Sequence, residues 1–283
     1  MGNLTNEIQE YEITFLLDER FPSNYGEITV PEIRIAVDKQ DIKKSWATIR
    51  IKSNSSTNAI SSARMKLDIF LGLYFLYSLN PKRINDNHGV TVNNLSTNQV
   101  SSELRAFVVT RGREDLDIFN QITSEYMELT QRENNEYIKI AMDYFRLGMM
   151  EYRKENSIID FFIALEALFS KEGPKIEHSI SNRVATLLGM DVNHRKGILR
   201  KVRELYSIRS KIVHGSKTEI NEVDRLQLVR WVRESILRFL VLSNHYQNRD
   251  EIIRLIDDSA LENSIRIELI KKSNILLPKV VRF

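Results

Sequence analysis

The spacing of the apolar residues changes near Ile118, and this change constrains the fold more than any other feature of the sequence. Before it, apolar and polar residues alternate in short runs, which is typical of strands. After it, apolar residues recur at steps of three and four, as on one face of a helix. We therefore predict an α+β protein, with a small mixed α/β domain that contains a β-sheet at 1–118 and an all-α helical bundle with a C-terminal helical extension at 119–283.

The first fifty residues predict a small sheet. Its strands are marked by apolar residues two positions apart: Ile13, Phe15 and Leu17; Ile28 and Val30; Ile33, Ile35 and Val37; Ile49 and Ile51. After a polar stretch at 53–62, we expect a helix at 63–79. An Asn-rich surface loop at 85–99 and a last strand at 103–110 should complete the domain.

The second half predicts a series of helices. We place them near 118–130, 135–154, 157–170, 179–189, 195–214, 221–246 and 259–272. In the helix at 157–170, six apolar residues at steps of three and four form one broad face, which should be core: Ile158, Phe161, Phe162, Leu165, Leu168 and Phe169. Glu166 lies at the edge of that face, where a carboxylate costs free energy to desolvate unless it has a partner.

The composition excludes several kinds of site. Hydrophobic residues make up 42% of the chain and charged residues 28%, the profile of a folded globular protein. With no Cys, the chain has no disulfide, thiol nucleophile or cysteine-bound zinc, and this fits a reducing cytoplasm. It contains no P-loop and no His-Glu-x-x-His motif, and His88, His178, His194 and His245 lack metal-ligand spacing. We expect neither a metal nor a cofactor.

Nothing in the sequence predicts a membrane partner. The start of the chain, MGNLTNEIQE, has no apolar stretch behind a basic end, so we expect neither export nor a lipid anchor. The most apolar run, 67–79, contains Asp68 and falls short of the ~20 residues that a bilayer span needs. We therefore interpret the run as a buried helix.

Arg209 is the first candidate functional residue. In the helix that ends at His214, the buried side is marked by Val202, Leu205, Tyr206, Ile212 and Val213. Arg209 follows Val202 by two turns and therefore projects with the apolar residues. A guanidinium there stays charged and must find an anion, either a carboxylate such as Glu166 or the phosphate of a ligand.

His214 is the second candidate. It ends the same helix and precedes Gly215, the residue type that most readily adopts the left-handed conformation after a helix. The imidazole should therefore lie near the surface. Arg209 and His214 are separated by about 140° around a regular helix, so they cannot point the same way from one chain. A homodimer in which two such helices meet at a twofold axis would bring both residue types to one groove.

The basic residues of the chain are concentrated around this pair. Between Asn193 and Lys217 the sequence has eight basic residues and one acidic residue, Glu204, a local balance of +7 in a chain whose formal charge is +3. The basic residues besides Arg209 are Arg195, Lys196, Arg200, Lys201, Arg203, Lys211 and Lys217. Such a surface attracts phosphate backbones, so we predict that these residues bind a polyanion, such as RNA. A solvated basic helix face without a partner is the other interpretation.

Three segments of this region resemble the HEPN superfamily, and within it the Apea-like HEPN domains of prokaryotic antiviral proteins. They are DFFIALEALFS at 160–170, ISNRVATLLG at 180–189 and LYSIRSKIVHG at 205–215, and the resemblance extends over roughly 135–245. The superfamily motif is an Arg separated from a His by four to six residues, and the segment from Arg209 to His214 matches it. The resemblance implies a helical bundle that pairs through the motif helices.

The resemblance also implies a metal-independent endoribonuclease. In such an enzyme His214 transfers a proton to or from the reacting oxygens, and Arg209 stabilises the charge that develops on the phosphate. Attack by the ribose 2′-hydroxyl leaves a 2′,3′-cyclic phosphate. Ser210, Glu166, Arg183 and Tyr206 are the expected supporting residues. A role in antiviral defence or in a toxin system follows from the family, with the N-terminal domain binding a trigger or regulator.

Two departures from the family pattern keep other functions open. Many active members have Asn, Asp or His directly after the Arg, whereas this chain has Ser210; nucleotide transfer to a Tyr two positions after the His is excluded by Ser216. One alternative is a non-catalytic HEPN module that binds RNA, a nucleotide or a protein partner. Another is an ordinary bundle in which Arg209 and His214 serve as an ion pair and a helix end.

Overall fold

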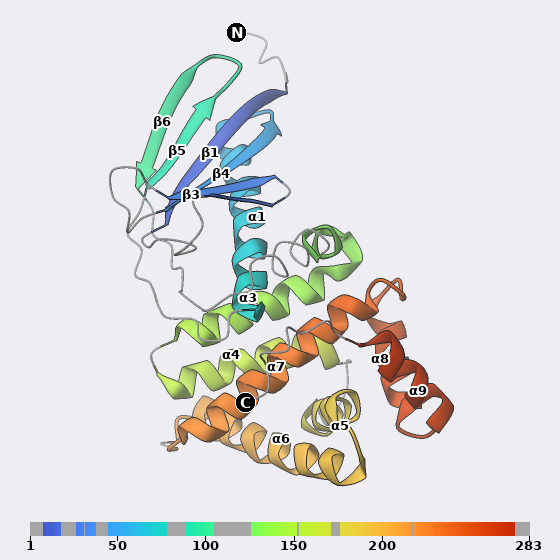
Figure 1. Cartoon of the computed structure of the whole chain (residues 1–283). Helices are drawn as coiled ribbons and strands as arrows, with labels where there is room; N and C mark the ends of the chain where they lie inside the picture. The colour runs from blue at the N-terminus through green and yellow to red at the C-terminus, as the bar shows by residue number, and fades with distance from the viewer. Residues whose placement is uncertain are drawn as a thin grey trace, which may run out of the picture. The chain divides into compact units, whose positions relative to one another are not determined.

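A computed structural model of the chain describes residues 8–17, 27–30, 32–37, 45–77, 89–104, 126–151, 153–170, 176–216 and 218–274. Across these residues the protein is α+β, as predicted, with an antiparallel sheet and a helix followed by a long helical region (Figure 1). The chain divides into two compact units, Met1–Ser124 and Glu125–Phe283. The boundary expected after residue 118 falls outside the described residues.

The first unit contains a six-stranded antiparallel sheet in the order β2-β3-β4-β1-β5-β6. The strands are β1 (Gln9–Leu17), β2 (Glu27–Val30), β3 (Ile33–Val37), β4 (Ser45–Ser53), β5 (Gly89–Asn94) and β6 (Gln99–Leu104). Alternate side chains of a strand share one face, and on this face Ile13, Phe15, Ile35 and Ile49 are fully buried. The helix α1 (Ser56–Tyr77) packs against β1 and β4.

The elements of the first unit differ from the expected ones in three places. The expected loop at 85–99 is wrong, because it contains β5, in which the buried Val92 pairs with Ile13 of β1. The Asn residues on both sides of this short strand favoured the prediction of a loop. The helix expected at 63–79 already begins at Ser56, because the Ser55 hydroxyl accepts a hydrogen bond from the Asn58 amide. The last strand begins at Gln99 rather than at 103.

The second unit is helical throughout its described length. Residues 126–131 are helical, and the 3-10 turn η1 (Glu133–Asn135) follows. The remaining helices are α3 (Glu136–Met150), α4 (Lys154–Phe169), α5 (Ile176–Leu188), α6 (Val192–Val213), α7 (Glu222–Leu242), α8 (Arg249–Ser259) and α9 (Asn263–Lys272). The most extensive packing joins α3 to α4 and α5 to α6, and α4 also contacts α7 (Figure 1). The six apolar residues expected as the core face of α4 are all fully buried.

The helices expected within the described residues are confirmed, with one omission and shifted ends, whereas residues 118–125 of the first expected helix lie outside the described part. α8 is not among the predicted helices, although Ile252, Ile253 and Ile256 are spaced as on a helix face and Asn248 caps its first turn. The expected helix at 135–154 ends at Met150, because Glu151 adopts an extended conformation before α4 begins. No helix in the described ranges is both long enough and apolar enough to cross a membrane.

α3 and α4 pack so closely at Gly148 that an added methyl group should destabilise the protein. A Cβ on Gly148 of α3 would lie 2.6 Å from Phe161 Cε1, and this ring is fully buried. Gly148→Ala should lower the free energy of unfolding by about 1–2 kcal/mol, because overpacking exceeds the gain in helix propensity. The matched control, Gly197→Ala in α6, meets no atom within 4 Å and should stabilise the protein. Denaturant unfolding of both variants measures the difference.

Asp160 of α4 makes stability depend on pH. Burial, and to a smaller extent the charge of Glu151, raise the pKa of Asp160 to about 6. An unfolded Asp has a pKa of ~3.9, so the free energy of unfolding should fall as the pH rises from about 4 to about 6. Asp160→Asn should therefore melt at a higher temperature than the unsubstituted protein at pH 7 and lose this advantage near pH 4. Thermal unfolding of both proteins across this pH range measures the difference, and Glu128→Gln, at an exposed carboxylate, is the control. A higher melting temperature of Asp160→Asn that persists at pH 4 would contradict the prediction.

Candidate functional site

Arg209 lies between α6 and α4 in a cluster with Glu166 and Tyr206. Its Nη2 is 3.3 Å from Oε1 of Glu166, so the carboxylate expected as its partner is confirmed. The guanidinium also lies over the Tyr206 ring at 5.5 Å, and the Tyr206 hydroxyl donates a hydrogen bond to the same Glu166 oxygen. Burial first and Glu166 second raise the pKa of Tyr206, so its hydroxyl stays protonated and acts as a donor.

The cluster positions Arg209 without using all of its donors. The side chains of Arg209 and Glu166 are 22% and 25% exposed, and ion pairs of this kind contribute only about 0–1 kcal/mol. A guanidinium has five N–H donors, and Nε of Arg209 has no hydrogen-bond partner among the described residues. Nε is buried, so a phosphate oxygen would have to bind the terminal Nη atoms, while Glu166 and Tyr206 hold the guanidinium in place.

His214 is the C-cap of α6 and is exposed, as predicted. Its backbone amide donates to the carbonyl of Ser210, and Gly215 follows with φ +80°, in the left-handed region that ends helices. The regular backbone up to Val213 keeps Arg209 and His214 on different sides of α6, about 140° apart. A single chain therefore presents an anchored guanidinium and an exposed imidazole in separate directions.

The other two expected supporting residues lie apart from this cluster. Ser210 is partly exposed on α6 next to Arg209. Arg183 of α5 instead binds both carboxylate oxygens of Asp257 on α8, at 2.8 and 2.9 Å, and donates to the Phe169 carbonyl. It joins α5, α8 and the end of α4. This role could not be predicted while α8 itself was missing from the expected helices.

The predicted RNA-binding residues occupy different sides of α6. Lys201 forms ion pairs with Glu204 and with Asp224 of α7, each at 2.9 Å. The stem of Arg195 packs against Gly189 at the end of α5. Lys196, Arg200 and Lys211 are exposed, and Lys217 lies outside the described residues. The local balance of +7 is thus not a single free surface.

His178 is a site neighbour that the sequence indicated only by its place before Arg183. Its Nδ1 is 2.7 Å from Nη2 of Arg203, so α5 and α6 are joined beside the Tyr206 cluster. Because a guanidinium only donates, Nδ1 accepts and the ring carries its hydrogen on Nε2. Asp224, which partners Lys201, had no signal in the sequence because it depends on how α7 packs against α6.

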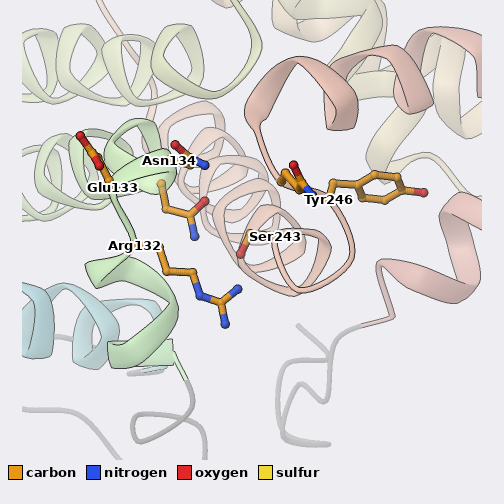
Figure 2. A pocket seen from close by; sticks show the side chains of 7 residues that line it. Arg132, Glu133, Asn134, Ser243 and Tyr246 are labelled. Carbon is orange, nitrogen blue, oxygen red and sulfur yellow. The ribbon is translucent and has the colours of Figure 1, made fainter.

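A hollow of about 300 Å³ lies between η1 and the end of α7. Its lining residues are Arg132, Glu133, Asn134, Asn135, Ser243, Tyr246 and Gln247. Figure 2 shows the ring of Tyr246 pointing away from Ser243, while Ser243 and Asn135 already donate to backbone carbonyls. Both side chains therefore satisfy carbonyls at the ends of nearby helical segments, and none of the candidate site residues lines this hollow.

No group of three His, Asp or Glu side chains is placed to hold a metal ion within the part of the chain that the structure describes. Comparison with models of protein families, with curated proteins and with solved structures finds no match to this chain. Function is therefore inferred from the residues of α4, α5 and α6.

Proposed function

We propose that this protein is a metal-independent, HEPN-type RNA endonuclease that acts as a homodimer. The observation that supports it best is the anchored Arg209, held by Glu166 and Tyr206 on the helix that ends with the exposed His214. A cation fixed before the substrate binds needs no reorganisation when charge develops on a phosphate. A role in cytoplasmic antiviral defence or in a toxin system, with the first unit binding a trigger or regulator, belongs to the same proposal.

Pairing of two copies completes the catalytic site. Arg209 and His214 diverge on one α6, and a twofold axis between two α6 helices brings Arg209 of one protomer towards His214 of its partner. Val213, next to His214, leaves 52% of its surface exposed, which is apolar area that a second helix would cover. The dimer is therefore part of the active site rather than an addition to it.

The reaction needs only the groups that such a site contains. The imidazole of His214 removes the proton from a ribose 2′-hydroxyl, whose oxygen then attacks the adjacent phosphorus. The bond between phosphorus and the 5′-oxygen breaks, and a proton returns to that oxygen. Arg209 stabilises the additional negative charge on the phosphate during attack. The products are a 2′,3′-cyclic phosphate and a 5′-hydroxyl end.

The alternative is a non-catalytic module that binds RNA, a nucleotide or a protein through the same surface. An Arg209 held by Glu166 and Tyr206 fits this alternative too, because binding a phosphate or a carboxylate needs a positioned cation but no proton transfer. The two functions differ in one observable, the cleavage of RNA.

Incubation of the purified protein with RNA in chelator tests the proposal. Unmodified RNA should be cut and its fragments should carry 2′,3′-cyclic phosphates. DNA and fully 2′-O-methylated RNA of the same sequence should stay intact, because neither has the attacking hydroxyl. Intact RNA under conditions in which the protein binds it favours the non-catalytic module, and cleavage of DNA contradicts the proposed chemistry.

A further inference from the structure

Four basic residues of α6 form a row on its solvent side. Lys196, Arg200, Arg203 and Lys211 lie within about 80° of one another around the helix axis, at 100° per residue. This side is opposite to the buried residues of α6, which are Ile198, Val202 and Leu205. We call the four residues the α6 row. Of the remaining basic residues, Arg195, Lys201 and Arg209 point to α5, α7 and α4.

One acidic residue, Glu204, lies at the edge of the α6 row, about 40° around the helix from Arg200. Its carboxylate is paired with Lys201, which lies further from the row. Lys196, Arg200 and Lys211 are exposed, and none of them has a carboxylate within ion-pair distance among the described residues. Arg203 contacts His178 and Ser181 of α5, which are not acidic. The row therefore carries a net positive charge.

The dimensions of the α6 row match one strand of a nucleic acid. From Lys196 to Lys211 it extends about 22 Å along the helix, and its far end is one turn from His214. We propose that the α6 row binds the backbone of single-stranded RNA, which runs along α6 and reaches His214. This inference rests on the proposed function, and it specifies the form of the substrate and its path.

A single line of cations follows one backbone, whereas a duplex presents two strands across a groove. The α6 row contains no aromatic side chain on which a base could stack, so binding should depend little on base sequence. His178 extends the row onto α5, since its Nε2–H is directed away from Arg203 and can donate to a phosphate or a 2′-hydroxyl.

Binding to RNA that cannot be cleaved tests the α6 row separately from catalysis. Fluorescence anisotropy with a single-stranded 2′-O-methyl oligonucleotide compares the unsubstituted chain with Lys196→Gln/Arg200→Gln/Lys211→Gln. The control, Arg132→Gln/Arg254→Gln/Lys271→Gln, removes the same charge from exposed residues outside the row. Loss of three phosphate contacts should weaken binding at least about tenfold at about 50 mM salt and reduce the salt slope by about 2. The control should stay within about twofold.

Each outcome decides the question. Equal losses in the two triple variants, or unchanged affinity in the first, overturn the inference. Tighter binding of a duplex of equal length, or of polyglutamate, also overturns it and assigns the row to another partner. If binding depends on the row but no RNA is ever cut, the inference holds and the nuclease proposal fails. If RNA cleavage depends on Arg209 and His214 while the row variant binds RNA normally, the nuclease proposal holds and the inference about the α6 row fails.

Discussion

Replacement of His214 with Ala should reduce the rate of RNA cleavage by about 10³-fold, since a positioned proton-transfer group contributes 10²–10⁴-fold. Arg209→Ala should cost about as much, because the developing phosphate charge loses the cation that stabilises it. Neither change should abolish RNA binding, which involves residues elsewhere on α6. Single-turnover cleavage in chelator, measured with saturating protein, separates the rate of the chemical step from affinity.

Two controls give these variants their meaning. His245→Ala removes an exposed histidine just after the end of α7, the same kind of position as that of His214 after α6, and should leave cleavage unchanged. Melting temperatures identify the structural alternative, in which Arg209→Ala releases Glu166 and Tyr206 and destabilises the protein. A lower melting temperature with unchanged RNA cleavage would contradict the catalytic assignment. A lower melting temperature with no RNA cleavage by any variant or by the unsubstituted protein would contradict it too.

The elements that were predicted well from the sequence are those whose own residues carry a clear local pattern. The apolar face of α4 and the end of α6 before Gly215 depend on residues a few positions apart, so local patterns were enough. β5 was missed because its place depends on β1, which lies far away in the sequence and supplies Ile13 opposite Val92. Pairing between distant segments is not encoded in the spacing of either one.

The candidate site shows the same division. Glu166 could be predicted as the partner of Arg209 because each was a charged residue at the edge of an apolar face, and two such groups stabilise one another. Arg183 was expected only from the family resemblance, and its partner Asp257 lies on α8, which was not predicted from the sequence. Lys201 counted toward the basic charge until α7 placed Asp224 beside it. A charge is assigned correctly only when every helix packed against it is known.

Glu166 holds Arg209 in position and also reduces the positive charge that Arg209 offers to a ligand. In the proposed nuclease, the carboxylate would offset part of the positive charge that a ground-state phosphodiester meets, which favours a transition state with additional negative charge. Among the described residues, the His214 side chain has no comparable anchor. In the proposed dimer this exposed imidazole would approach the held cation of the other protomer.

Mixing the two inactive variants should therefore restore activity. In a heterodimer of Arg209→Ala and His214→Ala protomers, one site has lost both residues, whereas the other pairs the intact Arg209 of one chain with the intact His214 of its partner. Random pairing makes half of the dimers mixed, each with one working site, so about a quarter of the unsubstituted rate should return. Coexpression with two affinity tags isolates the mixed dimer and should raise this to about half. If Arg209 and His214 of the same chain formed the site, no mixture of the two variants would cut RNA, because neither protomer has both residues.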